Sequence, residues 1–218
     1  NVVSVITSEN YQELVELGLH LAESANASGH YFEVVRGATP DPGMKRLTRQ
    51  SLIGLHRRLL PFHRHYARRL FAHLPAGARQ IATAYYLGNL RLHFEVQERN
   101  FEAPTRWPMR CTAGQTTLVV DHNGGFRACE LRGVAGDLRS HDMNAASALA
   151  SPEMRKETAA IGRDGCWCTH SCFIHESGKF SPRVQLFEIP WAWWKQNAER
   201  LPEASAGELD RFRNLELA

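Results

Sequence analysis

The sequence has little of the features that mark specialised protein classes. No apolar run approaches the ~18 residues that a membrane-spanning helix needs, so we expect no membrane partner. Its 26 Lys and Arg nearly balance 23 Asp and Glu, and the net charge of +3 is too small for a dedicated nucleic-acid-binding protein. The first 20 residues lack the basic start, long apolar stretch and cleavage site of a signal peptide. With 43% hydrophobic residues, the composition is instead typical of a globular protein.

Cysteines are also scarce, with five in 218 residues. An odd number leaves one thiol unpaired in any scheme made of disulfides alone. Cys166 and Cys168 are separated by one residue, a spacing that suits a shared metal ion better than two separate bridges. In the absence of a signal peptide, clustered cysteines indicate metal or cluster ligands in a reducing compartment, so we expect a cytoplasmic protein.

The N-terminal residues have the pattern of a strand–helix–strand unit. A β-branched run at 2–6 predicts a buried strand, and Leu14, Leu17 and Leu21 repeat at helical spacing after it. A second strand is predicted at 30–37. Because the connection is short, the two strands should be parallel neighbours.

Two helices are predicted in the middle of the chain, one from Thr48 to Leu70 with a kink at Pro61, and one at about 78–99. The stretch 56–69 is basic and rich in histidine. We expect its arginines and histidines to form a solvated helix face, with RNA binding as a weaker alternative. His63 and His65 are two residues apart, so they do not share a helix face and are not expected to form a metal pair.

The cysteines fall into two groups that a fold can bring to one centre. Residues 116–121 and 126–132 flank the turn sequence HNGG and predict a β-hairpin, which Cys111 and Cys129 bracket. Cys166, Cys168 and Cys172 follow in a C-x-C-x-x-x-C loop. Four thiolates from two such groups suit zinc or an iron–sulfur cluster. The alternative is that the cysteines are small buried core residues.

The segment CTAGQTTLVVDHNGGFRAC (111–129) resembles the opening of the SPASM or twitch domain of radical S-adenosylmethionine enzymes. Residues 2–23 and 30–37 are similar to the fifth strand and helix and the sixth strand of the partial barrel of that family. The resemblance implies an α/β fold: the C-terminal part of a partial TIM-type barrel (1–47), a helical connecting segment (48–107), a cysteine-rich SPASM/twitch domain (108–182) and a Trp-rich helical tail (183–218).

The resemblance also implies site residues. It makes Cys111, Cys129 and Cys172 the surest ligands of one auxiliary 4Fe–4S cluster, with Cys168 favoured over Cys166 as the fourth. It places S-adenosylmethionine or substrate near Arg36, although Arg36 is equally suited to a structural pair with a carboxylate. His170 and His175 are further candidates that are better explained as second-sphere or surface residues.

One departure from the family limits the implied function. The C-x-x-x-C-x-x-C motif that binds the S-adenosylmethionine-cleaving cluster is absent, since every cysteine lies at or beyond position 111. We therefore expect the C-terminal portion of a radical S-adenosylmethionine oxidoreductase or peptide- or metabolite-modifying enzyme, inactive by itself. The intact enzyme would use a second 4Fe–4S cluster, a peptide or small-molecule substrate and a donor such as flavodoxin or ferredoxin. The alternative function is a binding module stabilised by a four-cysteine zinc site.

Overall fold

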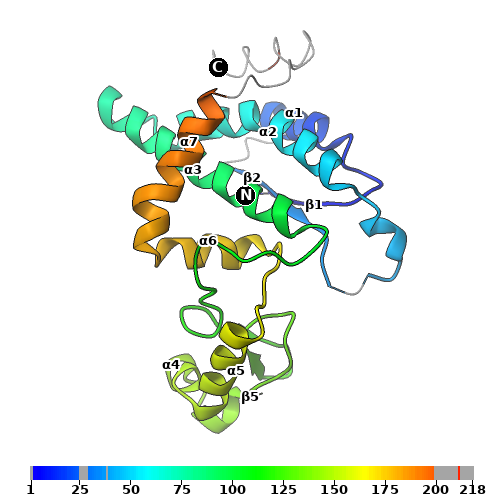
Figure 1. Ribbon diagram of the computed structural model, residues 1–218, viewed down its shortest axis with the longest axis vertical. Coiled ribbons are helices and arrows are strands. Elements are labelled where there is room, and N and C mark those ends of the chain that lie inside the picture. Colours follow the sequence, from blue (N-terminus) through cyan, green and yellow to red (C-terminus); the bar gives the residue numbers. More distant parts are fainter. Residues whose placement is uncertain (1, 25–28, 38, 199–210, 212–218) are drawn as a thin grey trace.

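The computed structural model describes residues 2–24, 29–37, 39–198 and 211 (Figure 1). In chain order the elements are β1 (Val2–Ile6), α1 (Leu14–Ser24), β2 (His30–Val34), the 3₁₀ turn η1 (Pro42–Lys45), α2 (Arg49–Leu70), α3 (Ala76–Asn100), β3 (Val119–Val120), β4 (Gly125–Arg127), β5 (Gly136–Asp137), the 3₁₀ turn η2 (Leu138–His141), α4 (Ala145–Leu149), α5 (Pro152–Arg163), α6 (Ser171–Lys179), the π-helical segment η3 (Val184–Glu188) and α7 (Ile189–Ala198). The fold is mixed α/β, as predicted, with more helix than strand. Within the described residues the strands form no closed barrel.

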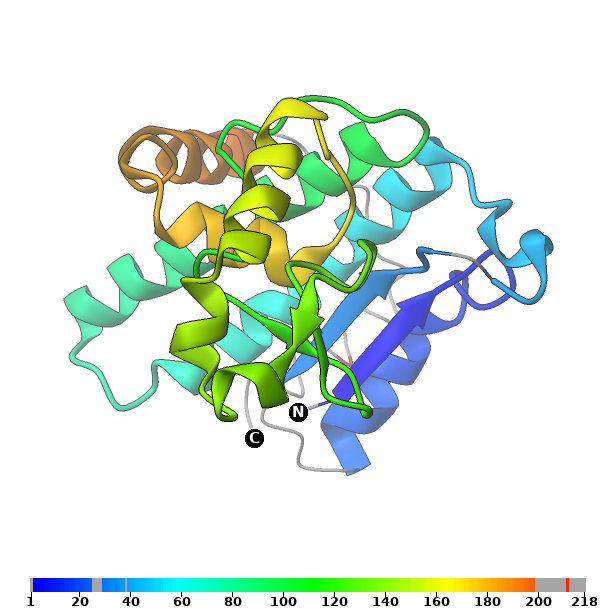
Figure 2. The same cartoon turned by 90° about the horizontal axis from the view of Figure 1, so that it is seen from below.

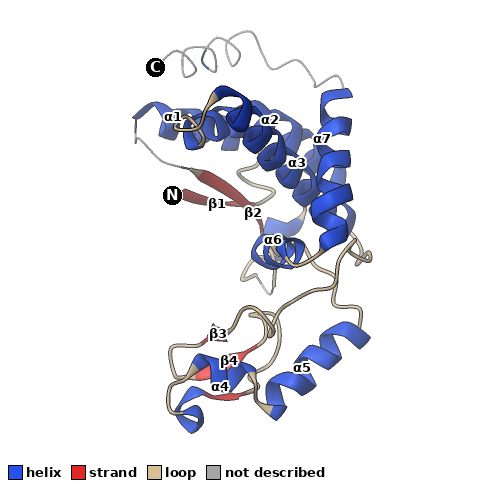
Figure 3. Cartoon of the chain, turned by 90° about the vertical axis from the view of Figure 1, so that its left-hand side faces the viewer, coloured by secondary structure: helices blue, strands red, loops and turns tan. Residues whose placement is uncertain are grey.

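The predicted strand–helix–strand unit is confirmed. β1 and β2 are parallel neighbours, with Val2 opposite His30 and Ile6 opposite Val34. Alternate residues of β2 are buried, because α1 and α2 lie on one side of the two strands (Figure 3). The other face leaves Val3 and Tyr31 exposed. The period-two alternation of a strand with one covered face accounts for this pattern.

Helix α2 continues through Pro61 and packs against α3. Here the expected solvated face is wrong for three histidines, since His56, His63 and His65 are buried. The reason is that α3 covers a second face of α2. The His56 ring stacks on Phe94 at a centroid distance of 3.9 Å, and its Nδ1 lies 2.9 Å from Oε1 of Glu98.

The cysteine-rich residues form a small lobe that Figure 1 shows at the end of the molecule away from α1 and α2. The predicted hairpin is present as antiparallel β3 and β4, with Val119 opposite Arg127, and β5 adds a third strand. Gly124 has φ +90° in the hairpin turn, a conformation that glycine adopts without strain. Helices α4 and α5 lie beside this sheet (Figures 2 and 3).

One hydrophobic core links the small lobe to the helices. It runs from Leu92 and Val96 of α3, through Cys111 and Cys129, to Ile189 and Ala192 of α7. Part of the predicted connecting segment and part of the C-terminal tail therefore share a core with the cysteine-rich residues. Among the helices of the described residues, none combines the length and the apolar character that a transmembrane span requires.

Candidate metal centre

Cys111 and Cys129 are held at the base of the hairpin. Cys111 precedes β3 and Cys129 follows β4, and both are buried. Because antiparallel pairing returns the chain to its starting point, the two thiols are in electrostatic contact although 17 residues lie between them in the sequence. Burial raises the pKa of both thiols, although backbone and side-chain hydrogen bonds partly oppose it.

Cys166 and Cys168 come from the coil between α5 and α6. Each interacts electrostatically with the other and with both hairpin cysteines, so every pair among these four thiols is coupled. Burial, reinforced by the other three sulfurs, raises the pKa of Cys168 to about 12. The two cysteine groups predicted to converge are thus brought together, and we call Cys111, Cys129, Cys166 and Cys168 the four-cysteine group.

The four thiols do not form a closed coordination shell as they stand. Among the described residues, no three His, Cys, Asp or Glu side chains are placed so that they could hold a metal ion. Burial, with a smaller contribution from neighbouring sulfurs, raises the pKa values of Cys111, Cys129 and Cys168, so these three thiols are neutral near pH 7. Binding of a metal or cluster would therefore draw the four sulfurs together and release their protons.

Cys172 lies in a different environment, in the first turn of α6. Burial raises the pKa of its thiol, and its electrostatic neighbours include Glu33, Arg36 and Glu130. By contrast, the electrostatic neighbours of Cys111, Cys129 and Cys168 include other cysteines. The predicted ligand Cys172 is therefore placed beside the strand end, whereas Cys166 and Cys168, between which the sequence left a choice, both join the four-cysteine group.

Arg36 links the end of β2 to the cysteine-rich lobe through the structural pairing that the sequence left open. Its guanidinium lies 3.3 Å from Oε2 of Glu33 and 2.8 Å from Oε1 of Glu130. Nε2 of His170 lies 3.0 Å from the same Glu130 oxygen. Burial opposes ionisation of Glu130, but His170 and Arg36 together lower its pKa. Glu130 directly follows Cys129, and His170 lies two residues after Cys168. This bridge therefore fixes both cysteine segments against the end of β2.

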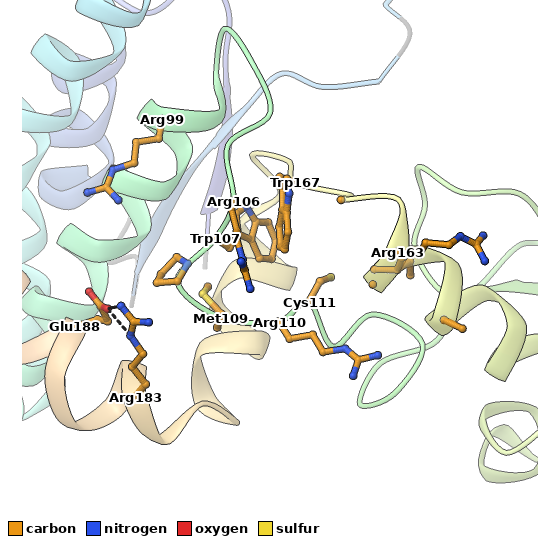
Figure 4. Close-up of a pocket in the computed structure, with 15 residues that line it drawn as sticks. Arg99, Arg106, Trp107, Met109, Arg110, Cys111, Arg163, Trp167, Arg183 and Glu188 are labelled. Carbon is orange, nitrogen blue, oxygen red and sulfur yellow. Dashed lines mark hydrogen bonds and ion pairs between the residues drawn. The ribbon is translucent and has the colours of Figure 1, made fainter.

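Cys111 also lines a basic cavity of about 1260 Å³ (Figure 4). Five arginines line it, namely Arg99, Arg106, Arg110, Arg163 and Arg183, together with Trp107 and Trp167. The Trp107 Nε1 donates to the carbonyl of Cys168 at 3.1 Å, and its ring lies 6.2 Å from that of Trp167. The two tryptophans therefore connect the cavity wall to the coil that carries Cys166 and Cys168. The sequence did not predict this cavity, although the position of Trp167 between two cysteines could have indicated an aromatic wall beside them.

Arg132 is a residue of the site that the sequence did not predict. Its guanidinium is fixed by Glu157 at 2.6 Å, and it interacts with the Cys166 side chain. A cation beside a cysteine favours the thiolate that a metal requires. Arg132 is thus the charged neighbour best placed to influence the four-cysteine group.

Comparison of the chain with protein-family models, with curated proteins and with solved structures finds no significant match. The resemblance to radical S-adenosylmethionine enzymes therefore rests on the sequence motifs alone, and any proposal about function has to be argued from the residues of the site.

Proposed function

We propose that the chain is the C-terminal portion of a radical S-adenosylmethionine enzyme and that its four-cysteine group binds one auxiliary 4Fe–4S cluster. The observation that carries this proposal is the mutual coupling of four thiols from two segments that lie 37 residues apart in the sequence, from Cys129 to Cys166. Four thiols are the donor set that both 4Fe–4S clusters and zinc require. The set differs from the one the family resemblance implies in that Cys166 takes the place of Cys172.

The surroundings of the four-cysteine group would suit a 4Fe–4S cluster. A 4Fe–4S cluster supplies one-electron transfer when bound, and its potential depends on nearby charges, hydrogen bonds and exposure to water. Arg132 places a cation at Cys166, and Trp107 donates a hydrogen bond to the carbonyl of Cys168. The bridge of Arg36, Glu130 and His170 holds the two cysteine segments next to each other. A cation would also stabilise thiolates bound to zinc, so the choice of the cluster over zinc rests on the sequence resemblance.

The basic cavity suggests where a substrate with negative charge would lie. Arg106 and Arg110 flank Trp107 and adjoin Cys111, whereas Arg183 is paired with Glu188 at 2.9 Å (Figure 4). An acidic peptide or an anionic small molecule would gain charge-assisted hydrogen bonds there. In the intact enzyme, S-adenosylmethionine, its cluster and an electron donor such as flavodoxin or ferredoxin would complete the reaction.

Anaerobic purification tests the proposal. We expect a brown protein whose broad visible absorbance is lost in Cys129→Ser and Cys166→Ser. Cys172→Ser is the matched control and should keep its colour. A colourless protein that holds one zinc ion and no sulfide would establish the structural alternative, and loss of colour in Cys172→Ser alone would restore the ligand set that the resemblance implies.

A further inference from the structure

A second cavity, of about 290 Å³, lies apart from the four-cysteine group and the basic cavity. Its walls come from β1, β2, α2, α3 and α6, and Tyr31, His63, Phe94 and Gln97 are among the residues that line it. The lining is mainly apolar and aromatic. A largely apolar cavity with a few convergent polar groups is the usual form of a small-molecule site.

Three polar side chains of this cavity have buried atoms without hydrogen-bond partners among the described residues. Neither ring nitrogen of His63 has a hydrogen-bond partner within the described part of the chain, and the same holds for Nε2 of His93 and Oε1 of Gln97. His63 is 2% exposed and Gln97 is 1% exposed. Buried polar atoms are nearly always paired, so three such side chains around one cavity point to a missing hydrogen-bonding molecule.

The orientation of Gln97 is fixed by its neighbours. Its Nε2 donates to the carbonyl of Thr169 at 3.1 Å and to Oγ of Ser171 at 2.8 Å. Rotating the amide would set two carbonyl oxygens against each other at Thr169. Oε1 of Gln97 is therefore an acceptor that requires a donor from the cavity.

The two histidines offer both kinds of hydrogen-bonding group without charge. Burial lowers the pKa of His63 and of His93 to about 3, so both rings are neutral near pH 7. A neutral imidazole donates from one nitrogen and accepts at the other. Glu33 also lines the cavity, but its carboxylate is paired with Arg36. The cavity thus presents no unbalanced charge to an ion.

We propose that this cavity binds an uncharged, planar nitrogen heterocycle of one or two fused rings, whose N–H group donates to Gln97 and whose ring nitrogen accepts from His63 or His93. The aromatic walls suit a flat molecule, since the His63 ring already meets Phe32 and Phe94 edge to face at 5.9 Å. The proposal does not depend on the cluster, because none of the four-cysteine group lines this cavity.

Binding of benzimidazole tests the proposal directly, with indene as a control of the same shape that lacks nitrogen. Titration calorimetry at pH 8 should give saturable binding of benzimidazole at or below about 1 mM, and indene should bind at least tenfold more weakly. Cys129→Ser should bind benzimidazole like the wild type, which separates this result from any failure of the cluster proposal.

A variant and a measurement on the wild type locate the binding. Gln97→Leu should weaken benzimidazole at least tenfold, whereas the matched control Gln12→Leu, on the exposed surface, should not change it. If Gln97→Leu does not fold, the nitrogen-15 shifts of the wild-type histidine rings decide, and those of His63 and His93 should move on binding. No binding at millimolar benzimidazole, equal binding of indene, or unmoved His63 and His93 signals would overturn the proposal.

Discussion

Acid should destabilise this protein through His63 and His93, whose rings are buried without hydrogen-bond partners at three of their four nitrogens within the described residues. Burial lowers their pKa values to about 3, against about 6.5 in the unfolded chain. Above pH 6.5 both rings are neutral in both states and contribute no pH dependence. Below it, the unfolded state takes up two protons that the folded state does not, so the free energy of unfolding falls until pH reaches about 3.

The size of the effect follows from how far the pH lies below the histidine pKa of the unfolded chain. At pH 5 each histidine lies 1.5 pH units below its unfolded pKa, which corresponds to about 2 kcal/mol at ~1.4 kcal/mol per unit. The two together remove about 4 kcal/mol between pH 8 and pH 5. That is a large share of the 5–15 kcal/mol that stabilises a typical domain.

Urea unfolding of wild type and His63→Phe at pH 8 and pH 5 measures the effect. Phenylalanine suits the site because the His63 ring packs against Phe32, Phe62 and Phe94. The variant should lose about 2 kcal/mol less than the wild type between the two pH values. His122→Gln, at an exposed position of the hairpin turn, should lose as much as the wild type. Equal losses in wild type and His63→Phe would show that burial of the His63 ring does not cause the acid sensitivity.

Four further predictions concern the cluster, two glycines and the attachment of the small lobe. Arg132→Gln should lower the reduction potential of the bound cluster by tens of millivolts, because a cation beside Cys166 favours the reduced state; an unchanged redox titration would contradict this. Gly114→Ala should destabilise the fold by about 2–4 kcal/mol, since Gly114 has φ +73° and a Cβ would lie 2.6 Å from Sδ of Met154. Gly54→Ala in α2 meets no atom within 4 Å and should stabilise by about 0.5–1 kcal/mol, as thermal unfolding of the pair would show. Arg36→Gln should cost about 1 kcal/mol or less in the same assay, because the Glu130 side chain of its bridge is 43% exposed.

The sequence predicted the elements whose signals are local. The β-branched run at 2–6, the leucine spacing of α1 and the HNGG turn each determine a structure within a few residues, and all three are present. Strand β5, at Gly136 and Asp137, lacks such a signal because neither residue favours strands. It forms through pairing with β4.

The remaining features depend on contacts between distant residues. Arg36 and Glu130 are 94 residues apart, and no periodicity in either segment indicates their pairing. The burial of His63 follows from the packing of α3 along α2, which a helical pattern within α2 cannot reveal. The spacing of Cys166 and Cys168 likewise did not determine which thiol faces the hairpin, since the path of the coil brings both to Cys111 and Cys129.

The count of iron and acid-labile sulfide in the anaerobically reconstituted chain shows whether the four-cysteine group binds a 4Fe–4S cluster. We expect about four of each per chain, falling to background in Cys166→Ser and unchanged in Cys172→Ser. Zinc in a one-to-one ratio with no sulfide, or full iron and sulfide in Cys166→Ser, would contradict this expectation.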